Sequence, residues 1–477
     1  MKKYDIIAIG TGSAMNIISG ILNSERDLKV AVIDKDEPGG ICLTRGCIPT
    51  KILLYSAEVV TIINRADIFG VNATIKNINF QKVMERMRSK IYHDINNIQK
   101  GLTQSQDLDY YQEIAEFVAP YTLKVGDEQI KGEMILLCIG SKPTIPLIKG
   151  LDQVDYHTSD SILKISKLPK SLGIIGGGYI AAEYGFFFAA MGSEVTIIGR
   201  NKQFVPQEEP EVSALAKEKL SEMINIHTNF EVIELIKTDN NQKKIIAVNQ
   251  STGEKIEEIA DEVLIAAGRS PTTDILHPEK SGIETDEKGW IKVNDFLETT
   301  KPNIWAFGDA TGKHLFKHTA NYESQIVYYN AFSDRSIEVD YHAVPHAVFT
   351  HPEIASVGML EKEAIEQFGE EGILIGFQRF EDTAKGDAME LADVFVKIIL
   401  EKETQRIFGA SIIGPQASVL IQEIINLMYT RTQSIIPIHR GMHIHPALSE
   451  VVERAALNIM PVHHYHHLLE HLGLSKE

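Results

Sequence analysis

The chain has 477 residues, with 65 acidic against 47 basic side chains and a formal net charge of −18. This length is typical of about three domains of roughly 150 residues each. An acidic surface repels phosphate backbones, which argues against nucleic acid as a partner. No apolar run approaches the roughly 18 residues of a membrane span, and glycines interrupt the short apolar stretch near the N-terminus, so we expect neither a membrane segment nor a signal peptide.

The first predicted elements form a dinucleotide-binding unit. An apolar strand at residues 6–9 leads into Gly10 and Gly12, and a helical pattern then leads to a second strand that ends at Asp34. Glycines let a backbone approach a pyrophosphate, and an acid at the end of the second strand binds a ribose hydroxyl. Met15 stands where a third small residue is usual, so we expect altered helix–strand packing there.

Two of the three cysteines lie in the next segment, "GGICLTRGCIPTK" at residues 39–51. A disulfide between Cys42 and Cys47 would close so short a loop that it stabilises the fold by only about 2 kcal/mol, which suits a reversible bridge better than a structural one. Pro49 favours a helix that starts near Cys47, where a thiolate is stabilised. Zinc is disfavoured, because the spacing is too long for a CxxC knuckle and no second pair exists. We therefore expect a redox protein of the reducing cytoplasm.

Other segments have simpler interpretations. Residues 79–102 show helical spacing, which predicts a helix packed on the first domain. Cys138 follows an apolar run and is expected to be an inert core thiol. The aromatic run 186–188 predicts a buried helix face. The C-terminal "HHYHHLLEH" predicts a solvated helix; metal binding by His463, His467 and His471 is the alternative.

A second dinucleotide-binding unit begins at Gly176 and Gly178, and its second strand is "EVTIIG". Two such units imply two bound dinucleotides on two α/β domains. Gly199 stands where the ribose acid is expected, and Arg200 follows it. An arginine there suits a 2′-phosphate, so we expect NADPH, with NADH possible, unless Arg200 is only an exposed loop charge.

With these motifs the chain resembles the flavoprotein disulfide reductases, a family that includes dihydrolipoamide dehydrogenase, glutathione reductase, mercuric reductase and mycothione reductase. The likeness covers nearly the whole chain, and its finer features are most similar to mycothione reductase. Five further segments resemble family motifs: "LLCIGSKP" (136–143), "LIAAGRSP" (264–271), "IWAFGDAT" (304–311), "VPHAVFTHPEIASVG" (344–358) and "HIHPALSEVVERA" (443–456).

The resemblance implies where the cofactors bind. The residues expected at FAD are Gly10, Gly12, Asp34, Lys51, Gly140 and Asp309. The residues expected at the nicotinamide cofactor are Gly176, Gly178, Tyr179, Arg200 and Gly268, with Tyr179 as a gate. An ion pair between Lys51 and Glu183 beside the flavin is implied by the family alone.

The resemblance also implies the catalytic roles. Cys47 faces the flavin, and Cys42 exchanges with the substrate through a mixed disulfide. His445, oriented by Glu450, moves the proton and reaches the site from the other subunit of a homodimer. His443 is an alternative to His445. Arg45 binds substrate, tunes Cys42 or faces solvent, and the sequence leaves these three alternatives open.

We expect an α/β fold with two Rossmann-like domains and a C-terminal α+β dimerisation domain. The expected parts are an FAD domain (1–150 and 272–342), an NAD(P)H domain (151–271) and a dimerisation domain (343–477). The expected function is reduction of a small disulfide of the mycothione or glutathione type. The alternatives are dihydrolipoamide dehydrogenase, which works with NAD in the opposite direction, and a non-catalytic flavin-binding protein.

Overall fold

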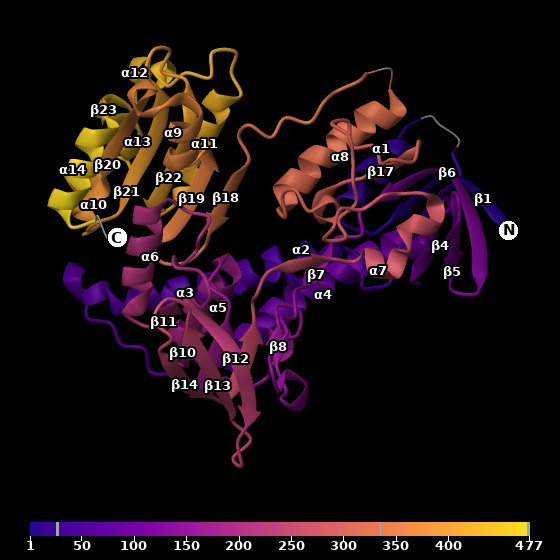
Figure 1. The fold of residues 1–477 in the computed structure, drawn as a ribbon, viewed down its shortest axis with the longest axis horizontal. Helices are drawn as coiled ribbons and strands as arrows, with labels where there is room; N and C mark the ends of the chain where they lie inside the picture. Colours follow the sequence, from indigo (N-terminus) through magenta and orange to yellow (C-terminus); the bar gives the residue numbers. More distant parts are fainter. Residues whose placement is uncertain (25–27, 334, 475–477) are drawn as a thin grey trace.

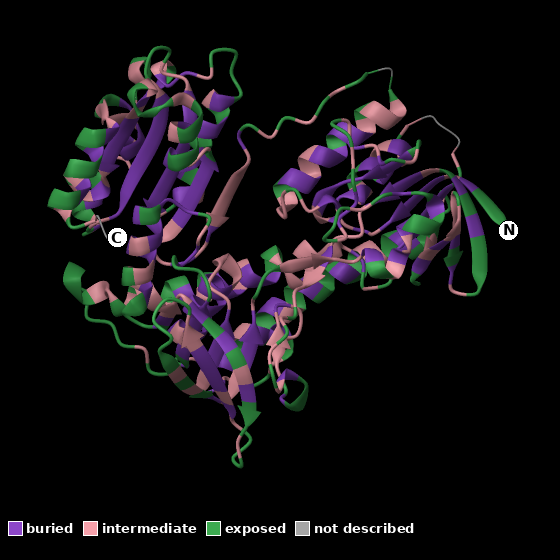
Figure 2. Cartoon of the chain, viewed as in Figure 1, coloured by how far each residue is buried: buried purple, intermediate pink, exposed green. Residues whose placement is uncertain are grey.

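The computed structural model describes residues 1–24, 28–333 and 335–474 and has three lobes, each built around its own sheet (Figure 1). The central strands of each lobe are mostly buried, whereas many exposed residues lie on the covering helices, the loops and the outer strands (Figure 2). The α/β fold class expected from the two glycine-turn units is confirmed. The sheets follow the order of the expected domains, and the domain boundaries themselves stay predictions.

The first lobe contains a seven-stranded sheet with the order β3-β2-β1-β6-β5-β4, in which β17 also pairs with β6. Strands β2 and β6 run parallel to β1, and β17 runs parallel to β6, so the carboxyl ends of these four strands meet at the same edge of the sheet. Helices α1 and α8 pack against each other beside this sheet. The elements are β1 (Lys2–Ile9), α1 (Ala14–Leu22), β2 (Val30–Ile33), β3 (Leu108–Tyr111), β4 (Ala115–Ala119), β5 (Thr122–Val125), β6 (Glu128–Leu137), β17 (Ile304–Ala306) and α8 (Lys317–Phe332).

The second lobe repeats this plan with a parallel sheet of order β11-β10-β9-β15-β8. An antiparallel three-stranded sheet, β12-β13-β14, packs beside it. The two connections between the lobes pair with each other as β7 and β16. The elements are β7 (Ser141–Pro143), β8 (His157–Thr158), β9 (Ser171–Ile175), α5 (Tyr179–Met191), β10 (Glu194–Gly199), α6 (Pro210–Ser221), β11 (Asn225–Thr228), β12 (Phe230–Lys237), β13 (Lys243–Asn249), β14 (Lys255–Ala260), β15 (Glu262–Ile265), β16 (Arg269–Pro271) and α7 (Thr273–Leu276).

Helices α2 (Gly40–Arg45), α3 (Cys47–Asn64) and α4 (Phe80–Gln104) run between the first two lobes. The predicted helix at 79–102 is confirmed as α4, but it does not pack on the first lobe alone. The ring of Phe80 lies 6.2 Å from the rings of both Phe187 and Phe188 on α5. This aromatic contact joins α4 to the second lobe, and the aromatic run of α5 is buried as expected.

One helical stretch, Gly40–Asn64, is long and apolar enough to cross a membrane by length and composition. The expectation that no stretch reaches this length was therefore wrong, because α2 and α3 follow each other with only Gly46 between them. A single helix of this kind is weak evidence for a membrane span, and 22% of its 18-residue window is buried. Its exposed apolar side chains, Tyr55, Val59 and Ile62, lie on α3.

The third lobe is built on a six-stranded sheet of order β18-β19-β22-β21-β20-β23. Helices α11 and α13 pack on its strands, and α14 closes the chain. The elements are β18 (Pro345–Val348), β19 (Glu353–Gly358), α9 (Glu361–Phe368), β20 (Ile373–Arg379), α10 (Ala384–Ala388), β21 (Phe395–Glu401), β22 (Ile407–Gly414), α11 (Ala417–Met428), α12 (Ile436–Arg440), α13 (Glu450–Leu457), β23 (Ile459–Pro461) and α14 (Val462–Leu472).

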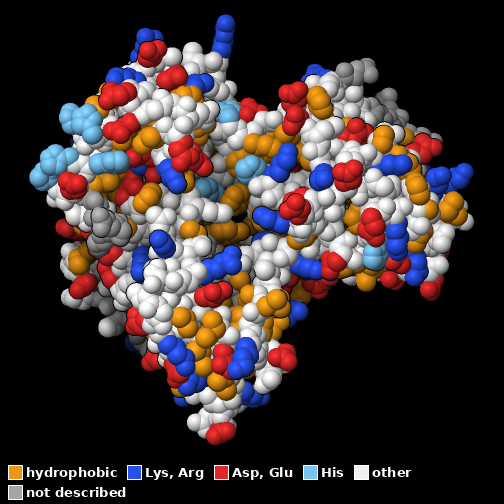
Figure 3. Space-filling model, viewed as in Figure 1, with side chains coloured by type: hydrophobic (Ala, Val, Ile, Leu, Met, Phe, Trp, Pro, Cys, Tyr) orange, Lys and Arg blue, Asp and Glu red, His pale blue; other side chains and the backbone are white. Residues whose placement is uncertain are grey.

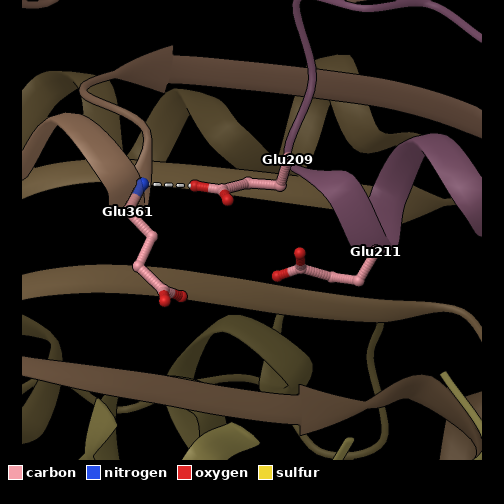
Figure 4. Close-up of side chains that lie close together, drawn as sticks. All are labelled: Glu209, Glu211 and Glu361. Carbon is pink, nitrogen blue, oxygen red and sulfur yellow. Dashed lines mark hydrogen bonds between the residues drawn. The ribbon is translucent and has the colours of Figure 1, made fainter. Parts of the chain in front are cut away.

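A buried ion cluster joins the second lobe to the third. Lys397 on β21 is 1% exposed, and its Nζ lies 3.0, 2.6 and 2.7 Å from carboxylate oxygens of Glu209, Glu211 and Glu361. Figure 4 shows the three carboxylates converging, with the backbone N–H of Glu361 donating to Glu209. Burial disfavours the ammonium form, but the three carboxylates outweigh burial and raise the pKa of Lys397. The cation at the centre of this cluster is therefore an amino group of the chain itself.

We expect Lys397→Ala to destabilise the protein by about 3–5 kcal/mol, because it leaves three carboxylates buried without their counter-charge. The measurement is urea unfolding followed by circular dichroism. The control is Lys362→Ala, since Lys362 on α9 is 85% exposed and pairs only with the exposed Glu366. An unfolding midpoint of Lys397→Ala equal to that of the control would contradict the role of the cluster.

Candidate active site

The glycine turn after β1 lies at one end of a large cavity, about 1200 Å³ in volume. Asp34 follows β2 at the same edge of the sheet and accepts hydrogen bonds from the backbone N–H of Thr11, at 2.8 Å, and from its hydroxyl, at 2.5 Å. Gly140 and Asp309, which follow β6 and β17, line the same cavity. The parallel sheet therefore brings the glycine turn, Asp34, Gly140 and Asp309 to one edge, although they are far apart in the sequence.

The backbone around this turn leaves room for a ligand but not for side chains. Gly10 has a φ of +102°, and a Cβ there would lie 2.1 Å from the carbonyl oxygen of Cys138. A Cβ on Gly40 would lie 2.7 Å from the Cα of Gly12. Thr319 is buried at the cavity wall, and its hydroxyl has no hydrogen-bond partner among the described residues. A cavity of this size with an unused polar group fits a dinucleotide.

The cysteine pair lies in the wall of this cavity, where α3 begins at Cys47 as Pro49 predicts. The hydrogen bond between the two thiols lowers the pKa of Cys47 to about 7; burial works against this shift, and the charge of Lys51 adds to it. The same hydrogen bond, together with burial, raises the pKa of Cys42. In the dithiol form, Cys47 is therefore the thiolate and Cys42 the donor.

Lys51 and Glu183 meet at the junction of the lobes. The Nζ of Lys51 lies 2.8 Å from both carboxylate oxygens of Glu183, which is 6% exposed. Glu183 also accepts from the backbone N–H of Phe349, at 3.1 Å, and the ring centroid of Phe349 lies 4.5 Å from the same Nζ. The ion pair that the sequence alone did not connect is thus present, and it holds a cation next to Cys47.

Asp309 is held by the segment that connects the first two lobes. Its carboxylate accepts from the hydroxyl of Ser141 at 2.5 Å, and Arg269 donates to that hydroxyl at 2.9 Å. Burial raises the pKa of Asp309. The pairing of β7 with β16 positions both partners, so the two segments that resemble domain connections also shape the cavity.

Two residues of this cavity, Cys138 and Lys317, were misplaced or missed by the sequence analysis. Cys138 lies just beyond β6 and lines the cavity, so it is not a core residue within a strand; burial raises its pKa to about 11, which keeps the thiol protonated. Lys317, at the start of α8, donates to Ser13 at 2.9 Å and lines the same wall. Nothing in the sequence indicated this position for Lys317, because it results from the packing of α8 against α1.

Arg45 forms ion pairs within the chain, and its role toward substrate or Cys42 stays open. Its guanidinium lies 2.6 Å from Asp36 and 3.3 Å from Asp160, and the side chain is 26% exposed. Arg45 therefore ties the short helix α2 to segments of the first two lobes. Because its charge is paired with two carboxylates of the chain, Arg45 is not a free solvent-facing charge.

The second glycine turn lies at a second cavity, about 1140 Å³ in volume. Gly176 has a φ of +131°, and a Cβ there would lie 2.1 Å from the carbonyl oxygen of Ala266. A Cβ on Gly199 would lie 3.1 Å from the Cα of Gly177, which explains why no acid stands at that position. Gly178, Gly268 and the exposed Arg200 also line this cavity.

Tyr179 lies between the two cavities and lines both. Burial raises the pKa of its phenol to about 12, so it stays neutral. Its ring centroid lies 6.2 Å from that of Phe316, which also faces both cavities. Figure 3 shows the surface hollowed where the three lobes meet. An aromatic wall thus separates two sites that each fit one dinucleotide.

His445 and Glu450 form a pair, but not at this cavity. The Nδ1 of His445 lies 2.8 Å from Glu450, whose other oxygen accepts from the backbone N–H of Ala447. The hydrogen bond from His445 lowers the pKa of Glu450. The His445 side chain is 66% exposed, and neither cavity is lined by any described residue beyond Tyr429. Within one chain, this pair is therefore separate from the cysteines.

His443 differs from His445 in its surroundings. Its side chain is only 9% exposed, with Nε2 3.0 Å from Glu423 and Nδ1 3.5 Å from Glu453. A side chain enclosed by its own subunit is poorly placed to reach another one. The two histidines that the sequence left as alternatives therefore differ in exposure: His443 is enclosed, whereas His445 is open to solvent.

The ionisation of the dithiol predicts how the alkylation rate of Cys47 depends on pH. We expect Cys47 of the reduced protein to be half-ionised near pH 7, and Cys42→Ala to raise its pKa because the donor to the thiolate is lost. Lys51→Met is expected to raise it as well. The measurement is the rate of alkylation of Cys47 against pH, followed by mass spectrometry of its peptide. Unchanged profiles in both variants would contradict the assignment of the thiolate.

Comparisons with known proteins agree with this geometry. The family model "Pyridine nucleotide-disulphide oxidoreductase" matches residues 4–343, and the model of that family's dimerisation domain matches residues 344–456. Among curated relatives, mycothione reductase of Mycobacterium tuberculosis H37Rv is 33% identical over 472 residues and dihydrolipoyl dehydrogenase of Chlamydia trachomatis serovar D is 33% identical over 469; the alignments cover 96% of this chain and 100% and 97% of those proteins.

Solved structures include the Cu(II) complex of the HOCl-induced flavoprotein disulfide reductase RclA from Escherichia coli. It superposes with a TM-score of 0.84 at 28% identity and covers 96% of this chain and 100% of that one. The family models together span nearly the whole chain, and the fold and both glycine turns agree with them. The chain therefore belongs to the pyridine nucleotide-disulfide oxidoreductase family of enzymes, whose members use a flavin and a pyridine nucleotide.

Proposed function

We propose that the protein reduces a small disulfide with electrons from NADPH, through a Cys42–Cys47 disulfide. The observation that carries this proposal is the asymmetric dithiol at the start of α3. One thiol is a thiolate at neutral pH and faces the cavity, and its neighbour is the protonated donor. Two thiols in these states divide the work between electron uptake and exchange with substrate.

FAD in the first cavity would pass electrons from the nicotinamide to the disulfide. On the chain's side, Gly10 and Gly12 let the backbone approach a pyrophosphate, and Asp34 is placed for a ribose hydroxyl. The buried hydroxyl of Thr319 offers a further hydrogen bond at the wall. Gly176 and Gly178 play the equivalent part in the second cavity, and Tyr179 is placed to open and close the path between the two cavities.

The thiols carry out the exchange in two steps. The Cys42 thiolate attacks the substrate disulfide, which forms a mixed disulfide and releases the first thiolate. Cys47 then attacks the Cys42 sulfur, which restores the Cys42–Cys47 bridge and releases the second thiolate. Two electrons from NADPH reopen the bridge, so that NADPH, one proton and one disulfide give NADP⁺ and two thiols. Lys51 stabilises the Cys47 thiolate throughout.

His445 of the partner subunit would exchange the proton with Cys42 and the leaving thiolate. Cys42 needs such a base, because its pKa is raised in the dithiol. Support comes from the exposure of the His445 segment, where Met442 and Ile444 are also exposed, and from the exposed apolar face of α3 beside the cysteines. Two apolar surfaces of this kind suit the dimer that the matched dimerisation domain implies.

The preference for NADPH rests on Arg200. Its side chain lies at the second cavity, and Gly199 cannot be replaced by an acid without displacing Gly177. A cation without a competing carboxylate suits a 2′-phosphate. Three cysteines are too few for a disulfide framework in a chain of 477 residues, so we place the reaction in the cytoplasm.

The second candidate is dihydrolipoamide dehydrogenase, because relatives of that name match at the same identity as mycothione reductase. That enzyme would use the same thiols and the same His445 in the opposite direction. The two candidates differ in nucleotide preference and in the physiological direction of electron flow. Measuring these two properties therefore distinguishes them.

The proposal is tested by anaerobic reduction of the flavin with NADPH and, separately, with NADH. We expect faster reduction by NADPH and a long-wavelength absorbance band that is absent from Cys47→Ser, because the thiolate of Cys47 would lie against the flavin in the proposed arrangement. Arg200→Ala, with Lys202→Ala as its control, is expected to reduce the preference for NADPH. Preference for NADH with rapid reduction by dihydrolipoamide would favour the second candidate, and a flavin that neither nucleotide reduces would exclude both.

Donation of His445 across the dimer is tested with mixed dimers. We expect His445→Gln to lower disulfide reduction by roughly 10²–10⁴-fold, as for loss of a general acid–base, while reduction of the flavin by NADPH continues. A heterodimer of Cys42→Ser with His445→Gln then contains one intact site, and we expect about half of the wild-type activity. An inactive heterodimer would show that each subunit uses its own histidine. His443→Gln is the matched control and should retain activity.

A further inference from the structure

The C-terminal helix α14 carries five histidines, and it has two different faces. Its inner face is buried at Val462, Tyr465 and Leu469. Tyr465 donates to Glu211 at 2.6 Å, and the Nε2 of His466 lies 2.6 Å from Glu361, so the helix contributes to the buried ion cluster of Lys397. Figure 3 shows histidine side chains gathered on the outer edge of the third lobe, where Figure 1 places α14.

In the last turn of this helix, His467 lies next to both His471 and Glu470. The ring centroids of His467 and His471 lie 4.5 Å apart, with their planes tilted by 42°. An oxygen of Glu470 lies 3.5 Å from the Nδ1 of His467, and the two side chains are 67% and 68% exposed. Neither the two cavities nor the proposed thiol chemistry uses any of these residues.

We propose that His467, Glu470 and His471 form a binding site for a divalent transition-metal ion such as Zn²⁺. Histidines four apart on a helix face the same way, and the segment "HLLEH" has the spacing that helical zinc sites use for two imidazole ligands. Zinc takes imidazole nitrogens at about 2.0–2.1 Å and carboxylate oxygens at similar distances. Because the rings are already adjacent and exposed, they converge on one ion by side-chain rotation alone.

The other close histidine pair on α14 is less suited to a chelate. His463 and His464 have ring centroids 4.2 Å apart. However, they are consecutive in the sequence, and consecutive side chains on a helix point in different directions. His466 is already hydrogen-bonded to Glu361. The site therefore belongs to the last turn of α14, outside the two cavities.

Metal binding there would act on the junction of the lobes. An ion held by His467 and His471 fixes the final turn of α14, whose inner face supports the carboxylates around Lys397. A ligand that binds only the folded helix stabilises the fold. The expected consequence is an upward shift of the thermal unfolding midpoint in Zn²⁺, which is independent of the proposed disulfide reduction.

The test is isothermal titration of the full-length, air-oxidised holoenzyme with Zn²⁺, in a buffer without thiols or chelators, so that the redox cysteines do not compete. We expect His471→Ala to weaken the binding by about tenfold or more, since it breaks the chelate. His463→Ala is the matched control from the same exposed helix and should change the affinity by less than about twofold. Both variants should retain flavin absorbance and disulfide reduction, because both side chains lie outside the cavities.

Two further measurements make the assignment sharp. Electron paramagnetic resonance with one equivalent of Cu²⁺ should show two coordinating nitrogens in the wild type and one in His471→Ala. Zn²⁺ should raise the unfolding midpoint of the wild type and not that of the double variant His467→Ala/His471→Ala. Equal Zn²⁺ affinity in the wild type and His471→Ala, or a larger loss in His463→Ala, would overturn the proposed site whether or not the enzyme reduces disulfides.

Discussion

The carboxylate of Glu183 is the point on which the site depends. It lies on α5 of the second lobe, pairs with Lys51 on α3 beside the redox cysteines, and accepts from the backbone of Phe349 at the beginning of the third lobe. Three parts of the chain thus meet at one buried acid. A buried carboxylate without a partner is costly, so Glu183 depends on its contacts with both Lys51 and Phe349. The same geometry brings a cation to Cys47, whose charge adds to the effect of the Cys42 hydrogen bond in lowering the pKa of that thiol.

The ion cluster around Lys397 is the second connection between lobes, and it lies away from the reaction. It joins α6 of the second lobe to β21, α9 and α14 of the third. Polar connections of this kind specify one relative arrangement of the lobes, because a shifted arrangement would leave charges unpaired. A fixed arrangement matters here, since Tyr179 separates two cavities whose walls come from different lobes. Rigid packing of the lobes thereby protects the alignment of the two sites.

A single chain contains every part of the proposed mechanism except a base at the cysteines. His445 and its partner Glu450 are formed and oriented, yet they lie on an exposed segment of the third lobe. The exposed apolar side chains of α3 and of the segment near His445 are unusual for an isolated subunit and ordinary for a dimer interface.

The sequence by itself determined the local features: the two glycine turns, the acid at Asp34, the helix that begins at Cys47 and the aromatic face of α5. These follow from local rules, because a turn, a cap or a helical period is encoded within a few residues. Only the tertiary structure decided which residues share a site. It placed Asp309 and Lys317 in the same cavity, paired Arg45 with Asp160, and enclosed His443 while leaving His445 exposed. Such contacts join residues far apart in the chain. Their energies depend on burial, which arises only when several segments pack together.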